Sequence, residues 1–298
     1  IDGQLQTSVA LEIASIEGNI HFYIRMDKGY RDALEAAFYA QYPSLEIVEV
    51  EDYTRKVPLN MPNKDWGLWG TAYTLIKPHG YPIKTYKDFE TEKERDEEQK
   101  IDPVATLLEA LAKVGPKEQL WIQMIINPVS AHSGSNWQAE ASALKDKLAK
   151  RPEKEKKSNK PILFEAFEIL FQGPSKEEKP KEKDTIPPEM KMTPGERKIV
   201  EEIERKASKQ GFETSIRFIF LGKKGFWNKG NLRLPFTYFS SYISDNLNAL
   251  QPLGPTLTKI HYSWFLPLNY FRDRRKYLKQ RQIFRNYIGK IGRASCRE

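Results

Sequence analysis

The alternation of apolar and polar residues near the start of the chain is the feature that most constrains its fold. Residues 9–16 and 20–26 alternate at period two, which is the pattern of strands with one buried face. The turn between them, Glu17-Gly18-Asn19, is rich in residues that tolerate left-handed backbone. The pattern therefore predicts a β-hairpin.

A helix and a further strand are expected after this hairpin. Asp27 can cap a helix over residues 28–42, and Pro43 prevents its continuation. The side chains that share one face of this helix are Tyr30, Leu34, Ala37, Phe38 and Tyr42. With a strand predicted over 45–51, the order is β-β-α-β. One βα unit upstream would complete a ferredoxin-like module, so we expect the N-terminus to be truncated.

The same order recurs further along the chain. Strands are predicted at 68–77, 83–89 and 120–126, and Asp102-Pro103 supplies an N-cap followed by proline at the first helical position. The expected buried stripe of that helix is Val104, Leu107, Leu108, Leu111 and Val114. We therefore predict an α+β fold of ferredoxin-like or split βαβ-type modules with mainly antiparallel sheets, followed by a long basic helix.

Composition and turn residues divide the chain into five parts. Residues 1–131 are expected to form N-terminally truncated α+β modules, and 132–192 a charged, partly helical linker with helices at 136–150 and 162–171. A second α/β portion is predicted over 193–264. It begins with a capping box at Thr193 and continues with a strand at 212–221, a helix marked by residues 232–247 and a strand at 257–262. A basic amphipathic helix is predicted over 265–290, and residues 291–298 resemble a translated sequencing adapter, which we expect to be an artefact.

The sequence nominates no catalytic residue and no metal ligand. The single cysteine, Cys296, lies in the adapter-like tail, so no thiolate metal site is expected. The four histidines show no helical i, i+4 pair and no neighbouring carboxylate at ligand spacing; they are His21, His79, His132 and His261. No apolar run approaches the roughly 18 residues that a membrane-spanning helix needs.

A glycine-rich loop at 225–231 has the G-x-x-x-x-G spacing of a phosphate-binding loop. However, Asn231 and Leu232 stand where a nucleotide site needs Lys and then Ser or Thr. The bulky side chains of Phe226 and Trp227 would also hinder close approach of the backbone to a phosphate. We therefore interpret the segment as a plain loop.

Positive charge is concentrated near the end of the chain. The formal net charge is +8, and residues 272–290 hold eight Lys or Arg against Asp273 alone. Tyr270, Tyr277, Phe284 and Ile288 are expected to form the apolar face of a helix over 268–288. The candidate residues for binding nucleic acid or lipid headgroups are Arg272, Arg274, Arg275, Lys276, Lys279, Arg281 and Arg285. Three interpretations stay open: a DNA-phosphate surface, a helix on anionic lipid, or a solvated connector.

Several phrases of the sequence resemble those of a known kind of protein. They are Phe38-Tyr-Ala-Gln-Tyr-Pro43, Trp66-Gly-Leu-Trp-Gly70, Asp102-Pro-Val-Ala-Thr-Leu-Leu-Glu-Ala-Leu111, Glu118-Gln-Leu-Trp-Ile-Gln123 and Tyr270-Phe-Arg-Asp-Arg-Arg275. The set resembles the N-terminal region of type IV secretion or conjugation ATPases, membrane-associated proteins of uncultured small-genome bacteria with a DNA-binding motor domain. The resemblance covers nearly all of residues 1–290, but these phrases carry no known chemistry.

The resemblance implies a non-catalytic assembly or binding region at the cytoplasmic face of the bacterial inner membrane. Hydrophobic segments would precede it, and a P-loop motor domain that binds ATP and magnesium would follow it, so no cofactor is expected in this chain. The implied partners are the motor domain of the same chain, DNA, an anionic membrane surface and a second copy of the chain. The alternative is a free-standing nucleic-acid-binding α+β protein, because ferredoxin-like sheets often bind RNA.

Overall fold

The computed structural model describes residues 8–85, 88–89, 102–129, 137–149, 192–226, 228, 230–244, 246–260 and 271–289. The chain divides into two compact units. One unit comprises Ile1–Ser135 and Gln210–Glu298, and the other comprises Asn136–Lys209. The first unit contains the sheet and the basic helix.

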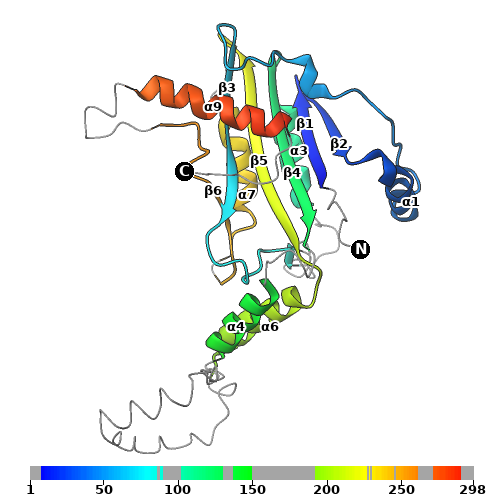
Figure 1. The fold of residues 1–298 in the computed structure, drawn as a ribbon, viewed down its shortest axis with the longest axis vertical. Helices are drawn as coiled ribbons and strands as arrows, with labels where there is room; N and C mark the ends of the chain where they lie inside the picture. Colours follow the sequence, from blue (N-terminus) through cyan, green and yellow to red (C-terminus); the bar gives the residue numbers. More distant parts are fainter. Residues whose placement is uncertain are drawn as a thin grey trace, which may run out of the picture. The chain divides into compact units, whose positions relative to one another are not determined.

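The first unit is built on one six-stranded sheet in which every neighbouring pair is antiparallel (Figure 1). The strand order is β2-β1-β4-β5-β3-β6. The strands are β1 (Val9–Ile16), β2 (Asn19–Arg25), β3 (Trp66–Leu75), β4 (Glu118–Pro128), β5 (Phe212–Lys223) and β6 (Leu250–Pro252). The predicted α+β class and antiparallel sheet are confirmed. Because β5 lies between β4 and β3, strands from the predicted portions 1–131 and 193–264 belong to one sheet.

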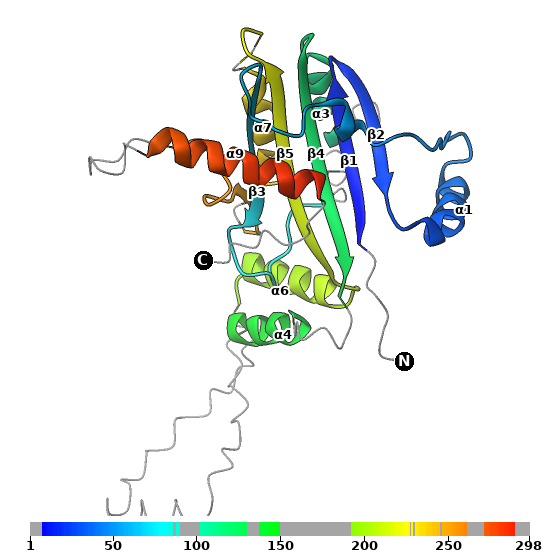
Figure 2. The same cartoon turned by 45° about the horizontal axis from the view of Figure 1, so that its top comes forward.

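Helices cover both faces of this sheet, as Figures 1 and 2 show. One face packs against α3 (Pro103–Ala112) and α7 (Leu234–Ser240), and the other is crossed by α9 (Arg272–Ile288). The short 3-10 helices are η1 (Lys28–Tyr30), η2 (Tyr53–Lys56) and η5 (Asn231–Arg233). None of the helices that the structure describes is both long and apolar enough to cross a membrane.

The predicted hairpin is confirmed, and its turn packs against the end of α3. Glu17 and Gly18 have φ values of 54° and 87°, so the turn uses the left-handed backbone that the sequence indicated. A Cβ atom on Gly18 would lie 3.0 Å from Ala112 O and 3.1 Å from Val114 O. Glycine therefore provides both the turn geometry and the close approach to α3.

The core between α3 and the sheet follows the predicted stripe of that helix. Leu107, Leu111 and Val114 are buried and pack with aromatic side chains of the strands. Asp102 caps α3 by accepting a hydrogen bond from Val104 N at 2.8 Å, as predicted. The buried residues contributed by β3, β4, β5 and α7 are Tyr73, Leu120, Ile122, Phe218, Phe220 and Phe239.

The second unit pairs α4 (Trp137–Leu148) with α6 (Pro194–Ala207). The predicted capping box at the start of α6 is present, with Thr193 and Glu196 bonding reciprocally. Ile203 and Ala141 are buried between the helices, and Lys145 pairs with Glu204 at 3.1 Å. The predicted helix at 162–171 lies outside the described residues.

Four predicted elements differ from the structure. Residues 45–51 form no strand, and residues 83–85 are not in a strand either. The helix predicted over 232–247 is shorter in the structure, where η5 and α7 follow one another and α7 ends at Ser240. The described part of the strand predicted over 257–262, residues 257–260, pairs with no other strand. Val48 and Val50 are 63% and 60% exposed. Residues of high β propensity form a strand only where they pair with a neighbouring strand and become buried, and these two do neither.

Helix α1 (Arg31–Gln41) is present where a helix was predicted, but it has no buried residue. Tyr30 and Tyr42, which were expected on its packed face, are 52% and 62% exposed. Figure 1 shows α1 beyond β2 at the edge of the sheet. Its apolar stripe therefore does not contribute to the core of the first unit.

Candidate binding surface on helix α9

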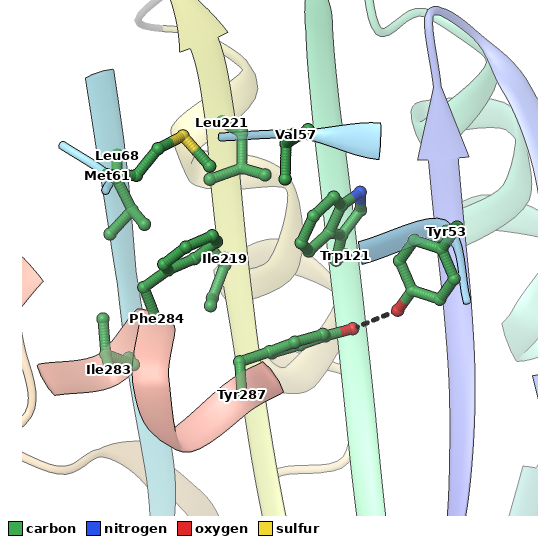
Figure 3. Close-up of a cluster of buried hydrophobic side chains, with 11 residues drawn as sticks. Tyr53, Val57, Met61, Leu68, Trp121, Ile219, Leu221, Ile283, Phe284 and Tyr287 are labelled. Carbon is green, nitrogen blue, oxygen red and sulfur yellow. Dashed lines mark hydrogen bonds between the residues drawn. The ribbon is translucent and has the colours of Figure 1, made fainter. Parts of the chain in front are cut away.

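Helix α9 lies across the sheet and inserts one side of its C-terminal half into the core (Figure 3). Gln280, Ile283, Phe284 and Tyr287 are its buried residues. Their i, i+3, i+4, i+7 spacing puts them on one face of a helix. They pack against residues of η2, the following loop and the strands: Tyr53, Val57, Met61, Leu68, Trp121, Ile219 and Leu221.

The buried face differs from the predicted one. Phe284 is buried and Ile288 packs at the margin of the cluster, but Tyr277 is 39% exposed, and Tyr270 lies outside the described residues. The start of α9 extends beyond β3 (Figure 1). Tyr277 precedes Gln280, the first buried residue of α9, so its seven-residue spacing from Phe284 does not bring it into the core.

A buried polar cluster joins the C-terminal half of α9 to the sheet. The Tyr53 hydroxyl donates to Glu12 Oε2 at 2.6 Å and lies 2.8 Å from the Tyr287 hydroxyl. Gln123 Nε2 donates to Glu12 Oε1 at 2.9 Å and to Tyr287 O at 3.2 Å. All four side chains are buried, and Figure 3 shows the bond between the two tyrosines. Because buried polar groups need partners, this cluster favours one position of α9.

Arg217 of β5 strengthens the same junction. Its NH1 group donates to Asn286 O at 2.7 Å, near the C-terminus of α9, where the helix dipole favours a cation. Burial lowers the pKa of the Arg217 guanidinium to about 10, while Tyr287 and Glu12 oppose this shift. Arg217 is therefore charged at neutral pH. Burial is also the main reason that the pKa values of Tyr53 and Tyr287 lie well above the usual tyrosine value.

Three of the seven candidate cations are used locally within the fold. Arg272 Nε donates to Ile260 O at 3.4 Å, and Arg281 NH1 donates to the Tyr277 hydroxyl at 2.8 Å. Lys279 Nζ donates to the carbonyl oxygens of Gly254 and Leu257 at 3.2 and 3.3 Å. The bonds of Arg272 and Lys279 position α9 against residues 254–260, whereas the bond of Arg281 lies within the helix; all three side chains are half-buried.

The other four candidates are exposed, and we call them the α9 cationic surface: Arg274, Arg275, Lys276 and Arg285. At 3.6 residues per turn, Arg274, Arg275 and Arg285 lie on the side of the helix away from the buried face, whereas Lys276 lies on the side of that face but before its first residue, Gln280. The N-terminal half of the helix also exposes Phe271 at 61% and Leu278 at 53%. The surface combines cations with apolar side chains on a helix that is fixed at its other end.

The glycine-rich loop is organised by a buried carboxylate. Glu118, 2% exposed, accepts hydrogen bonds from Asn228 N and from Asn231 Nδ2, the latter at 2.9 Å. This carboxylate takes hydrogen bonds that the described part of the loop could otherwise offer to an anion. Trp227 and Lys229 lie outside the described residues.

Among the described residues, no group of three or more His, Cys, Asp or Glu side chains could hold a metal ion. His21 and His79 are exposed, whereas His132 and His261 lie outside the part of the chain that the structure describes.

Sequence reasoning missed the polar cluster beneath α9. Glu12 lies in β1 between Leu11 and Ile13, where alternation indicates a solvated face. That face becomes buried because η2 and α9, the latter more than 250 positions later in the chain, cover it. No local pattern around Glu12 could have shown this.

The geometry defines an α+β domain whose antiparallel sheet carries a basic helix fixed across one face. Residues 4–226 match the sequence model of the family described as "Domain of unknown function (DUF8128)", and the chain belongs to this family. The match includes β1–β5 and ends before α7, β6 and α9. No curated protein and no solved structure matches the chain significantly.

Proposed function

We propose that this chain is a non-catalytic assembly and binding region of a membrane-associated, DNA-translocating ATPase of the type IV secretion or conjugation kind. In this proposal the region works at the cytoplasmic face of the bacterial inner membrane, and α9 contacts DNA phosphates. The observation that carries the DNA contact is the exposure of Arg274, Arg275 and Arg285 of the α9 cationic surface on the side of the helix away from its buried face.

The anchoring of α9 favours a binding role. Ile283, Phe284 and Tyr287 fix the helix on the sheet, and Arg217 holds the backbone near its C-terminus. Phosphate binding by cations releases condensed counterions and requires no base recognition. A helix that is already positioned loses less conformational freedom on binding than a free basic segment would. These points support a phosphate-tracking surface over a solvated connector.

The wider role rests on the sequence phrases that resemble secretion and conjugation ATPases. In this proposal, ATP and magnesium are bound by a motor domain of the same polypeptide, and the present region supports its assembly. Three of the five phrases fall on β3, α3 and β4, one covers the end of α1, and one includes the start of α9. The resemblance supports the wider role, and the DNA contact is argued from the exposed cations of α9.

An anionic membrane surface is the second candidate partner of α9. Phe271 and Leu278 are exposed close to Arg274 and Arg275, and a helix of this composition can lie at a lipid interface with its apolar side chains inserted. The two partners make different demands. Lipid binding needs both the apolar side chains and the cations, whereas DNA binding depends mainly on the cations.

Salt-dependent binding to duplex DNA tests the role of α9. Changing Arg274, Arg275 and Lys276 together to Gln removes up to three phosphate contacts. The slope of log affinity against log salt should therefore fall by up to about 2.7. The matched control changes Lys28 of η1 and Lys198 and Lys209 of the second unit to Gln, which alters net charge equally at exposed positions without changing any residue of α9. The control should retain most of the original slope.

An unchanged slope in the α9 variant would exclude the DNA contact. If the same variant instead loses binding to vesicles containing phosphatidylserine, and Leu278→Ser weakens that binding further, the membrane is the partner. The genomic reading frame tests the wider role. Upstream apolar segments and a downstream Walker motif would support an ATPase, whereas a stop codon directly after Lys290 would favour the free-standing nucleic-acid-binding protein.

A further inference from the structure

A second basic surface lies at the end of the sheet where β5 ends and β3 and β4 begin, the upper end in Figure 1. We call it the basic tip. It consists of four exposed lysines and one exposed aromatic side chain, contributed by three segments that are distant in sequence: Lys64, Lys117, Lys223, Lys224 and Phe226. Neither the family match nor the role proposed for α9 assigns any function to it.

Backbone hydrogen bonds hold the three segments of the basic tip together. Lys223 N donates to Lys117 O at 3.1 Å, and Lys224 N donates to Asp65 O at 2.8 Å. The loop that follows β5 turns back, with Phe226 N donating to Lys223 O at 3.1 Å. The lysines are therefore neighbours in the fold although their positions in the chain differ by up to 160 residues.

Phe226 is exposed but held in place. Its side chain is 52% exposed, and Lys117 Nζ lies 3.9 Å from its ring centroid. At this distance the Lys117 ammonium group makes a cation–π contact with the Phe226 ring. The remaining exposed surface of the ring can receive a further flat group. Phe226 thus combines an open aromatic surface with an adjacent positive charge.

The loop that carries Phe226 is fixed by the buried carboxylate of Glu118. Glu118 accepts hydrogen bonds from Asn228 N and Asn231 Nδ2, and also from Gly115 N at 3.3 Å. The position of the loop is therefore set within the fold before any ligand arrives. A loop that is already in position loses less conformational entropy when a ligand binds.

We propose that the basic tip binds single-stranded nucleic acid, with a base stacked on Phe226 and the phosphates paired with the surrounding lysines. Aromatic side chains beside cations are typical of surfaces that bind single strands without sequence preference. A duplex is a poorer fit, because its stacked bases do not expose their faces to Phe226. Glu17, Asp65 and the buried Glu118 are also present at this end, so the four lysines exceed the carboxylates by one.

This proposal is independent of α9. The basic tip shares no residue with the α9 cationic surface, and its expected ligand is a single strand, whereas α9 is expected to contact duplex phosphates. The failure of one proposal can therefore be distinguished from the failure of the other by changing one surface and leaving the other intact.

Fluorescence anisotropy with a labelled oligonucleotide of about 15 deoxythymidines tests the basic tip on the full chain. Phe226→Ala should weaken binding about tenfold with little change in the salt slope, because it removes stacking and no charge. Phe226→Trp should retain binding. Changing Lys223 and Lys224 together to Gln should lower the salt slope by about 1.4. The matched control, Lys28→Gln with Lys198→Gln, changes net charge equally without changing any residue of the tip.

Unaltered thermal unfolding of each variant will show that its effect is on binding, as is expected for exposed side chains. The proposal is overturned if the oligonucleotide does not bind, or if binding is the same in the Phe226→Ala and control variants. It is also overturned if the tip variants keep oligonucleotide binding but lose binding to phosphatidylserine vesicles, since the tip would then be a lipid contact. Loss of duplex binding in the α9 variant alone would leave this proposal standing.

Discussion

At the scale of single residues, the cluster around Glu12 is the feature that distinguishes this fold. Glu12 is 3% exposed and accepts hydrogen bonds from both Tyr53 and Gln123. The Tyr287 hydroxyl adds a contact from α9. Since removing one partner of a buried polar group leaves the others unsatisfied, such clusters make a helix position specific more than they add stability.

Replacing Tyr287 by Phe tests this residue-scale argument. The ring remains to fill the core, but its hydroxyl contact with Tyr53 is lost, so the free energy of unfolding should fall by about 1 kcal/mol. Urea unfolding followed by tryptophan fluorescence measures this change. Tyr39→Phe on α1 is the control, because Tyr39 is 41% exposed and its change should have little effect. Equal stability of the two variants would argue against the cluster as an anchor of α9.

At the scale of elements, β3 approaches β5 closely at Gly70. A Cβ atom on Gly70 would collide with the backbone oxygen of Phe218 in β5. On the other edge of β3, Thr258 Oγ1 accepts from Gly70 N at 3.1 Å, and Thr256 Oγ1 accepts from Ala72 N at 2.9 Å. These bonds satisfy backbone groups where no further strand pairs with that part of β3 among the described residues.

We expect Gly70→Ala to destabilise the first unit by about 1–3 kcal/mol, because a backbone atom blocks the added methyl group and the strands must move apart. Thermal unfolding monitored by tryptophan fluorescence measures the loss. Gly254→Ala is a suitable control, since no atom lies within 4 Å of the added Cβ there. A Gly70→Ala variant as stable as this control would contradict the close packing of β3 on β5.

At the scale of the whole molecule, the first unit depends on an element outside the matched family region. The family match ends at residue 226, yet α9 covers one face of the sheet with Ile283, Phe284 and Tyr287. Burial of Ile283 and Phe284 alone contributes roughly 3–6 kcal/mol. This is a large part of the 5–15 kcal/mol that stabilises a typical domain.

A chain that ends at residue 260 should therefore lose cooperative unfolding, and the emission of Trp121, which is fully buried beneath α9, should shift to longer wavelength. Differential scanning calorimetry and fluorescence measure the two effects. Adding a peptide of residues 271–289 in trans should restore part of the original signal. Retention of the full melting temperature by the shortened chain would mean that α9 is not part of the core.

The local sequence determined those features that depend on neighbouring residues. The β1–β2 hairpin, the Asp102 cap, the Thr193 capping box and the basic helix were all predicted, because turns, caps and periodic faces are encoded over a few positions. The exposed cations of α9 were also among the predicted candidates. The bonds of Arg272 and Lys279 to the rest of the fold could not be predicted, since they depend on carbonyl groups of residues 254–260.

Only the tertiary structure decided which faces are buried and which strands are neighbours. The same β propensity yields a central strand at residues 212–223 and no strand at 45–51, because only the former meets partner strands on both sides. Likewise, Glu12 and Arg217 are buried against segments distant in the chain, since Tyr53 of η2 donates to Glu12 and Arg217 donates to Asn286 O of α9. Burial and pairing arise from contacts between segments far apart in the chain, so the local sequence pattern cannot contain them.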